Sequence, residues 1–199
     1  TYNGEDGFDT LDLSSGSLDL STSTILGIER LISSNYNPLN MTIAQFTSFQ
    51  EVSNMVAITQ GGTIPLAGMT LYNLVIQLSA AGNAIDASIL APGSNINVRG
   101  GNGADTIIGS GMGDFLYGGI GNDRVEGGGG NDQLDGGAGL DTVLGGDGDD
   151  ILLLQQHSDL VAGDVLSGGA GFDTLSITGT MPLDLSIATL VSIERLQLP

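Results

Sequence analysis

The sequence predicts an all-β fold, a right-handed parallel β-roll or β-solenoid. A nine-residue period runs without a slip from Gly100 to Leu153, and the eighth position of every unit in it is aliphatic. Glycine accounts for 33 of the 199 residues, well above its usual share of about 7%. Because successive side chains of a strand point to opposite faces, one aliphatic residue in each short strand predicts a coil that stacks on itself around a narrow core.

Six consecutive units make up this period. They read GGNGADTII, GSGMGDFLY, GGIGNDRVE, GGGGNDQLD, GGAGLDTVL and GGDGDDILL. Their sixth position is always aspartate, at Asp105, Asp114, Asp123, Asp132, Asp141 and Asp150. The phase returns near the N-terminus and again after an interruption at 154–158, in three further units whose aspartates are Asp9, Asp164 and Asp173. Three residues of strand and a six-residue turn form half a coil, so we expect two units to close one coil.

The spacing of glycine and aspartate suits a turn that holds a hard cation. Glycine adopts positive φ without steric cost and lets backbone carbonyl groups approach an ion closely. The aspartate at position six brings a carboxylate to the same point in each turn. Calcium takes about six to eight oxygen ligands in irregular geometry, whereas zinc prefers histidine and cysteine, and the chain has one His and no Cys. We therefore expect several Ca²⁺ ions in stacked turns.

These units resemble the nonapeptide G-G-x-G-x-D-x-U-x, with U aliphatic, of the RTX (repeats-in-toxin, hemolysin-type calcium-binding) family. The resemblance implies a parallel β-roll with ions in its turns, most like that of RTX surface-layer or large adhesin proteins. At matching positions the candidate metal ligands are Asp9, Gly101, Asn102, Gly103, Asp105, Asp114, Gly119, Gly121, Asn122, Asp123, Gly128, Gly130, Asn131, Asp132, Gly137, Gly139, Asp141, Gly146, Asp147, Gly148, Asp149, Asp150, Asp164, Gly169, Gly171 and Asp173.

Two units depart from this pattern. Ser110 and Met112 replace glycines in the second unit, so the ion expected beside Asp114 is missing or distorted. The unit at 159–167 keeps Asp164 but lacks the paired glycines, so weaker ligation is expected there.

Calcium is expected to be needed for folding. The inward aliphatic side chains of the six units bury too little surface to offset the conformational entropy of the segment from Gly100 to Leu153. The stacked carboxylates also repel one another until a cation neutralises them. The repeat region is therefore predicted to be largely unfolded without calcium and to fold as it binds the ion.

Composition and motifs exclude several function classes. The chain has four arginines and no lysine, against 23 acidic residues. The resulting net charge of −19 disfavours nucleic acid and anionic lipid as partners. No apolar stretch is long enough for a transmembrane segment. His157 has Ser158 and Asp159 only as sequence neighbours, which cannot form a catalytic triad, and the sequence lacks H-E-x-x-H and G-x-S-x-G. We expect no enzyme activity.

Four segments are expected along the chain. Residues 1–32 form an N-terminal partial RTX unit, 33–99 are calcium-poor solenoid coils, 100–153 are the β-roll, and 154–199 are degenerate units and C-terminal strands. Within 33–99 a capping-box pattern at Thr42 predicts a short helix over about 42–51. Residues 71–78 are expected to form a strand, and the inward aliphatic positions are expected to continue backward through Val98 and Ile89.

The two chain ends resemble each other. Residues 7–11 recur as 171–175, an offset of 164, and residues 28–31, Ile-Glu-Arg-Leu, recur as 193–196, an offset of 165. This repetition favours one module of a tandem array, and the start at Thr1 suggests a piece of a longer protein.

The resemblance implies that the protein is exported by type I secretion and is located outside the cell, at the cell surface. The expected function is a calcium-dependent structural module of a surface-layer or adhesin protein that self-associates or meets neighbouring copies of itself. The alternative is an accessory calcium-binding RTX domain of a type I secreted enzyme or toxin. Further copies of the unit beside this chain would favour the first, and an adjoining hydrolase motif the second.

Overall fold

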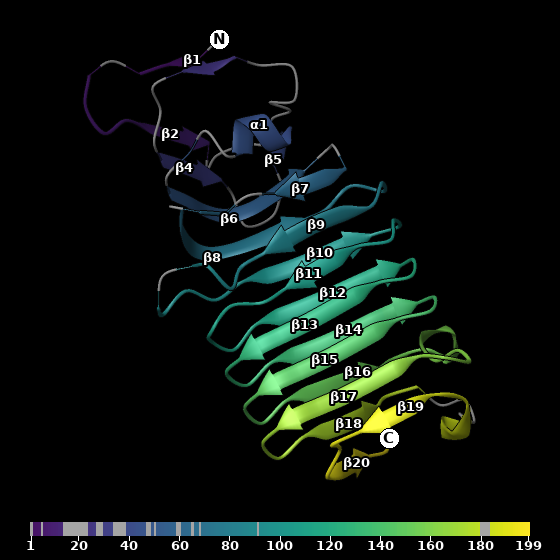
Figure 1. The fold of residues 1–199 in the computed structure, drawn as a ribbon. Helices are drawn as coiled ribbons and strands as arrows, with labels where there is room; N and C mark the ends of the chain where they lie inside the picture. Colours follow the sequence, from purple (N-terminus) through teal and green to yellow (C-terminus); the bar gives the residue numbers. More distant parts are fainter. Residues whose placement is uncertain are drawn as a thin grey trace.

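The computed structural model describes residues 2–4, 6–13, 24–26, 30–33, 39–46, 49, 51–58, 61–64, 66–67, 69–90, 92–179 and 184–199. Over these residues the chain forms an all-β parallel solenoid, as predicted (Figure 1). From β6 onward, each coil places one strand in each of two parallel sheets, here called the long sheet and the short sheet, and the core lies between them.

The strand order of each sheet follows the winding of the chain. The long sheet runs β2 (Thr10–Leu13), β4 (Arg30–Ser33), β6 (Glu51–Ile58), β8 (Thr70–Gln77), β10 (Asn97–Gly101), β12 (Phe115–Ile120), β14 (Gln133–Ala138), β16 (Ile151–Leu154), β18 (Thr174–Ile177) and β20 (Arg195–Gln197), with β5 (Leu39–Met41) beside β6. The short sheet runs β7 (Gly62–Ile64), β9 (Asn83–Asp86), β11 (Thr106–Ile108), β13 (Arg124–Gly129), β15 (Thr142–Asp147), β17 (Val165–Ala170) and β19 (Thr189–Val191). The remaining elements are the pair β1 (Tyr2–Asn3) and β3 (Ile25–Leu26), helix α1 (Ile43–Phe46), and the 3₁₀ turns η1 (His157–Asp159) and η2 (Leu185–Ile187).

Two nonapeptides close one coil, as the period predicts. Leu116 pairs with Leu134, and Val125 with Val143, in each case two repeat units further along the chain. The strands are longer than the expected three residues, because glycines of neighbouring coils continue the pairing, as Gly119 does with Gly137. This extension brings the glycine backbones of successive coils side by side.

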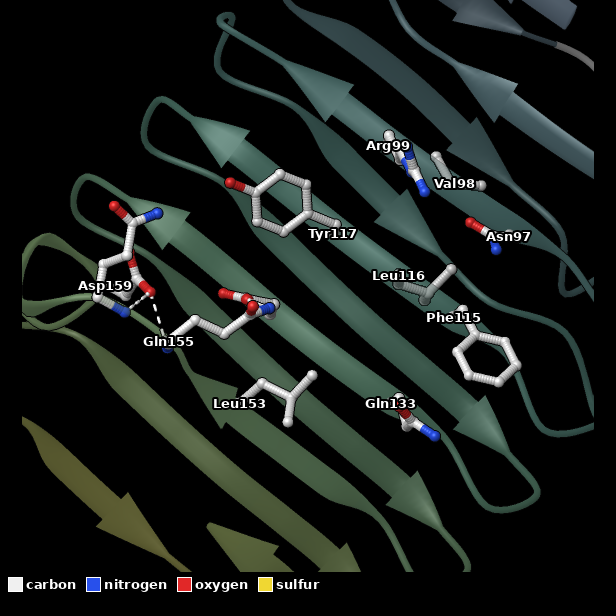
Figure 2. Close-up of a pocket in the computed structure, with 12 residues that line it drawn as sticks. Asn97, Val98, Arg99, Phe115, Leu116, Tyr117, Gln133, Leu153, Gln155 and Asp159 are labelled. Carbon is white, nitrogen blue, oxygen red and sulfur yellow. Dashed lines mark hydrogen bonds between the residues drawn. The ribbon is translucent and has the colours of Figure 1, made fainter. Parts of the chain in front are cut away.

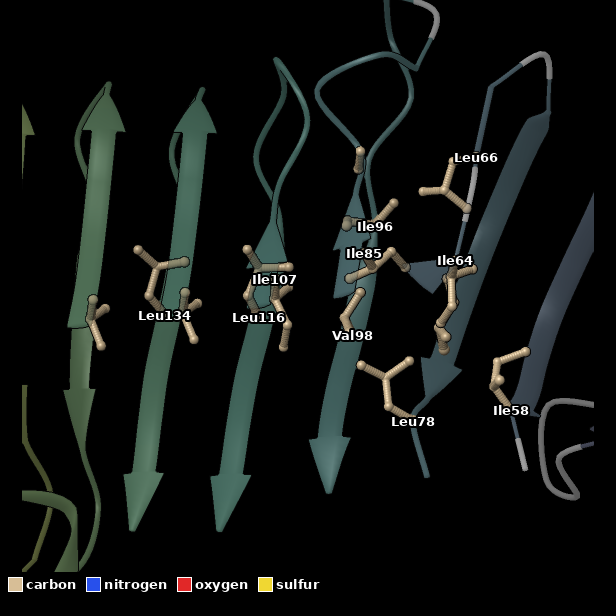
Figure 3. Close-up of a cluster of buried hydrophobic side chains, with 14 of the residues drawn as sticks. Ile58, Ile64, Leu66, Leu78, Ile85, Ile96, Val98, Ile107, Leu116 and Leu134 are labelled. Carbon is tan, nitrogen blue, oxygen red and sulfur yellow. The ribbon is translucent and has the colours of Figure 1, made fainter. Parts of the chain in front are cut away.

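The aliphatic residue at position eight points into the core from both sheets. The long sheet contributes Val98, Leu116, Leu134, Leu152 and Leu175, and the short sheet contributes Ile107, Val125, Val143 and Leu166, all at most 3% exposed. Figure 3 shows part of this row, continuing into the N-terminal coils at Ile85, Ile64 and Ile58. Burial of these stacked side chains supplies the hydrophobic stabilisation of the solenoid.

The interruption after Leu153 lengthens one coil without breaking the stacking. Leu166 pairs with Val143, and Leu175 with Leu152, each across two repeat units and the interruption between them. The extra residues form the loop that contains η1. The inward positions therefore resume in phase on its far side.

The expectation that Ile89 faces the core is wrong. Ile89 is 54% exposed, and Ile85 occupies the inward position, where it pairs with Ile107 of the next coil. The chain turns directly after β9, where Asp86 Oδ1 accepts hydrogen bonds from the amide and hydroxyl of Ser88. The added turn residues shift the phase of this coil. Val98, by contrast, is buried as expected.

The predicted helix is present but short. It covers Ile43–Phe46, and its N-terminus has the expected reciprocal bonds, from the Thr42 amide to Gln45 Oε1 and from the Gln45 amide to Thr42 Oγ1. Glu51, placed in the helix by the prediction, begins β6. Pairing with β4 and β8 outweighs the propensity of an isolated helical turn. The strand expected over 71–78 is confirmed as β8.

Candidate metal centre

Two ladders of aspartates run along the solenoid, one in each row of turns. In each ladder the backbone amide of one aspartate donates to Oδ1 of the aspartate in the next coil, at 2.8–2.9 Å. The turns leading to the short sheet carry Asp105, Asp123, Asp141 and Asp164. The turns leading back to the long sheet carry Asp114, Asp132, Asp150 and Asp173. The sequence period thus becomes two continuous rows of buried carboxylates.

Most of these carboxylates have one oxygen without a hydrogen-bond donor. Among the described residues, no donor reaches the buried Oδ2 atoms of Asp105, Asp123, Asp132, Asp141, Asp150 and Asp173. A buried carboxylate oxygen without a partner is energetically costly, because it loses its hydration and gains nothing in return. An unpartnered Oδ2 atom of this kind recurs along both ladders, at the places where a cation is expected.

Each of these oxygens lies against the first glycine of its own unit. A Cβ added at Gly127 would overlap Asp132 Oδ2, and one added at Gly145 would overlap Asp150 Oδ2. Only a residue without a side chain leaves this space beside the carboxylate open.

The second and fourth glycines bring backbone carbonyl groups to the same turns. A Cβ at Gly119 would overlap the carbonyl oxygen of Gly101, and one at Gly121 that of Gly103. The second glycines hold φ between +88° and +118°, a conformation that other residues rarely adopt. Carbonyl oxygens and carboxylates therefore recur together along each row of turns.

The two units that depart from the repeat pattern are also the two whose aspartates are satisfied. Asp114 Oδ2 accepts from the Ser110 amide at 2.5 Å, and Asp164 Oδ2 accepts from the Val161 amide at 2.7 Å. Ser110 replaces a second glycine and is not among the described residues with positive φ, so its amide is free to turn toward Asp114. Both carboxylates therefore have a donor from the chain itself, and weaker ligation at these two units stays a prediction.

Burial raises the pKa of the ladder carboxyls from Asp105 to Asp150. Desolvation is the largest cause, and it raises the pKa of Asp132 to about 7 and those of Asp123, Asp141 and Asp150 to about 6. Neighbouring carboxylates of the ladder add to the rise, while the backbone amide bond lowers it. Without a cation, Asp132 is therefore partly protonated near neutral pH, and Asp123, Asp141 and Asp150 take up protons as the pH falls to about 6.

A further set of hydrogen bonds between coils lies outside the two aspartate ladders, at position five of the units. Asn122 Oδ1 accepts from the Leu140 amide, Asn131 Oδ1 from the Asp149 amide, and Asp149 Oδ1 from the Phe172 amide, at 2.8–3.1 Å. These side chains are exposed and their Oδ1 atoms accept hydrogen bonds between coils, as is common in turns. Asn102 and Asp147, also predicted as ligands, occupy the third position of their units and are exposed.

Sequence reasoning missed the residues that begin and end the ladders. The Asn83 amide and Nδ2 both donate to Asp105 Oδ1, at 2.7 and 2.8 Å, and the Ile96 amide donates to Asp114 Oδ1. At the other end, Glu194 Oε2 accepts from the Asp173 amide at 2.8 Å. The spacing from Asn83 to Asp105 is 22 and that from Asp173 to Glu194 is 21, so a search at a fixed period of nine passes over both.

The turns fit calcium by the chemistry of their donors. No group of three or more His, Cys, Asp or Glu side chains converges within the described part of the chain. An ion held here would take its ligands from the unpartnered Asp Oδ2 atoms and from glycine carbonyl groups, an all-oxygen set of the kind calcium prefers. When bound, calcium would neutralise the stacked carboxylates and join one coil to the next.

A cleft of about 370 Å³ lies apart from these turns, on the outer face of the long sheet. Figure 2 shows it between β10, β12 and β14, with the η1 loop at one end. The loop reaches over the sheet, where Gln155 Nε2 donates to Asp135 Oδ2 at 2.7 Å. Asp159 in turn accepts from the amides of Gln155 and Gln156. These contacts secure the insertion to the solenoid, and the carboxylates already have their donors.

Other predicted residues are placed as follows. Asp9 lies in the turn equivalent to that of Asp173, since the Arg30 amide donates to the Asp9 carbonyl as the Arg195 amide does to that of Asp173, at 3.0 and 2.9 Å. His157 begins η1, and its side chain lies outside the described part of the structure. No helix in the described ranges is long and apolar enough to cross a membrane.

Comparison with known families matches the same turns. The family described as RTX calcium-binding nonapeptide repeat (4 copies) matches residues 99–134, 117–152 and 162–176. These segments contain both aspartate ladders from Asp105 to Asp173. Comparison with curated proteins and with solved structures gave no match.

Proposed function

We propose that this chain, which carries RTX calcium-binding nonapeptide repeats over residues 99–152 and 162–176, is a calcium-dependent structural module of a secreted bacterial surface protein of the surface-layer or adhesin type. In this role calcium binds the turns, the solenoid becomes rigid, and copies of the module associate. The repeat solenoid is a calcium-binding structural unit and not a catalytic fold.

The row of unpartnered Asp Oδ2 atoms carries the proposal. In the two ladders, six buried Oδ2 atoms have no donor among the described residues, and each lies beside a glycine, so they would destabilise a metal-free fold. A cation that binds these oxygens after export would remove this penalty. Millimolar calcium is available outside the cell, and RTX repeats are typical of secreted proteins. Folding coupled to calcium thus favours an extracellular place of action.

Charge supports the assembly part of the proposal. A net charge of −19 makes copies repel one another in the absence of a counterion. Calcium bound in the turns reduces this repulsion for every copy. The exposed strand edges at the solenoid ends then supply backbone groups for contact between copies.

A calcium titration of the whole chain tests the proposal. Far-ultraviolet circular dichroism and light scattering are recorded on the same sample, from excess chelator to millimolar calcium. We expect β structure and association to rise together and chelator to reverse both. β structure that persists in excess chelator would contradict the calcium-dependent fold, and a folded chain that stays monomeric at all concentrations would contradict the assembly role.

A further inference from the structure

The outer face of the long sheet carries two exposed aromatic rings on one strand. Phe115 and Tyr117 alternate with the inward Leu116 on β12, so both point out of the solenoid, and they are 49% and 36% exposed. The other exposed aromatic rings among the described residues, Phe8 and Phe172, each lie under an arginine guanidinium. No contact of this kind covers the Phe115 or Tyr117 ring within the described part of the chain.

Planar polar side chains flank each ring on the neighbouring strands, and all of them line the cleft of about 370 Å³ described above. Across β10, β12 and β14, the residues in register are Asn97, Phe115 and Gln133 in one row, and Arg99, Tyr117 and Asp135 in the next. Figure 2 shows the Tyr117 ring between Arg99 on β10 and Gln155 at the η1 loop. Each ring therefore has hydrogen-bonding groups on both sides.

Three of these polar side chains have no partner within the chain. The side chains of Asn97, Arg99 and Gln133 form no hydrogen bond or ion pair with another described residue. Arg124, on the outer face of the short sheet, by contrast pairs with Glu126. In a chain with four arginines and 23 acidic residues, the Arg99 guanidinium is thus left available to a ligand.

The η1 loop forms one end of the cleft and fixes its polar groups. Asp135 is 3% exposed, and its two oxygens accept from the Gly137 amide at 3.0 Å and from Gln155 Nε2 at 2.7 Å. Asp159 holds the Gln155 backbone from the other side, where its Oδ2 accepts from the Gln155 amide at 2.9 Å. The Gln155 side chain is therefore held in place before any ligand arrives, which lowers the entropic cost of binding.

Exposed rings beside planar polar groups suit a sugar. One face of a pyranose ring consists of C–H groups, which pack on an aromatic side chain, while its hydroxyl groups pair with amide, guanidinium and carboxylate groups. Phe115 and Tyr117 are two residues apart on one strand, a distance of about 6.6 Å along the chain. This spacing allows two adjacent sugar units to contact one ring each.

Other classes of ligand fit this face less well. The net charge of −19, with Asp135 and Asp159 at the loop end of the cleft, disfavours acidic polysaccharides and nucleic acid. An extended peptide that adds a strand needs an open sheet edge, but β12 is paired with β10 on one side and with β14 on the other. Recognition on this face therefore depends on side chains alone.

We propose that this cleft binds a neutral glycan, with the Phe115 and Tyr117 rings against adjacent sugar units and Arg99 donating to their hydroxyl groups. The inference goes beyond the proposed function, because it gives the module a ligand other than calcium. The two are linked through folding. The cleft spans the three coils of β10, β12 and β14, so it forms only where these coils are stacked.

Saturation-transfer difference NMR on the whole chain in millimolar calcium tests the ligand class. The probes are neutral hexasaccharides of glucose, mannose, galactose and N-acetylglucosamine, with a hexasaccharide of glucuronic acid as the acidic counterpart. We expect one or more of the neutral probes to bind in calcium and none to bind in excess chelator. The proposal is overturned if no neutral probe binds at millimolar concentration, or if the acidic probe binds more tightly than all of them.

Matched substitutions test whether the bound probe occupies the cleft. Phe115→Ala and Tyr117→Ala should each raise the dissociation constant of that probe about tenfold. Phe172→Ala, which removes a ring that is likewise 49% exposed but lies outside the cleft, should leave the constant unchanged. Arg99→Gln should raise it about fivefold, and Arg124→Gln should not change it. Unchanged binding in both Phe115→Ala and Tyr117→Ala would overturn the assignment of this site.

Circular dichroism separates loss of the site from loss of the fold. The calcium midpoints of the cleft variants should equal that of the natural chain, because the substituted side chains are exposed. Weaker glycan binding at an unchanged midpoint supports the site. A chain that folds and associates in calcium but binds none of the neutral probes refutes the glycan site and leaves the proposed function standing.

Discussion

The backbone amide of Asp132 donates to Asp150 Oδ1 at 2.8 Å, while the other oxygen of Asp150, Oδ2, is buried beside Gly145 without a donor among the described residues. One oxygen of the carboxylate thus joins two coils through the backbone. The other is left for a partner from outside the chain. This division of roles recurs along both ladders and leads to four predictions.

The first prediction compares two aspartates of the same ladder. Asp132→Asn keeps an oxygen for the Asp114 amide but removes the charge and the unpartnered Oδ2. Loss of a charge-assisted contact of about 1.5 kcal/mol should raise the calcium concentration at the folding midpoint about tenfold. Circular dichroism during calcium titration measures this midpoint. Asp114→Asn is the control, and its shift should be clearly smaller, because the Ser110 amide already satisfies Asp114 Oδ2. Equal shifts would contradict the assignment.

The second prediction concerns two nearby glycines. A Cβ at Gly127 would overlap Asp132 Oδ2, whereas one at Gly129 meets nothing closer than 3.8 Å. Gly127→Ala should therefore lower the free energy of unfolding in calcium by about 1–3 kcal/mol. Gly129→Ala should change it by less than about 0.5 kcal/mol. Urea unfolding at saturating calcium measures both, and similar losses in the two variants would argue against a closely packed ion cradle.

The third prediction restores the repeat pattern. Ser110→Gly permits the positive φ that the other second glycines adopt, and it lets the backbone amide turn away from Asp114 Oδ2. Isothermal titration calorimetry should then count one more calcium ion per chain. Ser110→Ala removes the hydroxyl but keeps a side chain, so its ion count should stay that of the natural chain. A gain in both variants would show that the hydroxyl, and not the backbone, limits binding.

The fourth prediction concerns pH. The pKa of Asp132 in the metal-free fold is about 7 and those of Asp123 and Asp150 are about 6, above the ordinary value of 3.8. The folded chain therefore binds more protons than the unfolded chain over this window. The stability from these groups is fully present below pH 3.8 and is lost as the pH rises through about 7. In chelator, the folded fraction measured by circular dichroism should therefore be larger near pH 5 than near pH 8, where the repeat region is expected to be largely unfolded.

The calcium-bound chain should respond in the opposite sense. Calcium binds the carboxylate form, so protons compete with it wherever the pKa is raised. The calcium midpoint should therefore fall as the pH rises from about 5.5 to about 7.5. A midpoint that does not change with pH over this range would show that the ladder carboxyls are not the groups that bind the ion.

The repeat sequence by itself was sufficient to predict the regular part of the fold. Position eight must be apolar to face the core and position six is always aspartate, so the period predicts both the inward row from Leu116 to Leu152 and the aspartate ladders. The sequence also singles out the two units whose Asp114 and Asp164 accept amide donors from the chain itself, because Ser110 and the missing glycines before Asp164 are visible as departures from a strict pattern. A regular local sequence is sufficient to predict the structure where each coil repeats the coil before it.

Tertiary structure decided the features that depend on contacts between coils. Ile85 and not Ile89 faces the core, because an inserted turn shifts the phase and only pairing with Ile107 restores it. Glu51 joins a strand because β4 and β8 pair on either side of it. Asn83 and Glu194 join the ladders at spacings of 22 and 21, which no fixed period contains.

The two leucines of the Ile-Glu-Arg-Leu repeats show the same limit. Their sequences and their pairing with the preceding strand are alike, yet Leu31 is buried and Leu196 is exposed. Sequence determined the coil to which each residue belongs. Burial was decided by the neighbouring coil, because the core of a solenoid lies between its coils and each coil buries its end only against the next.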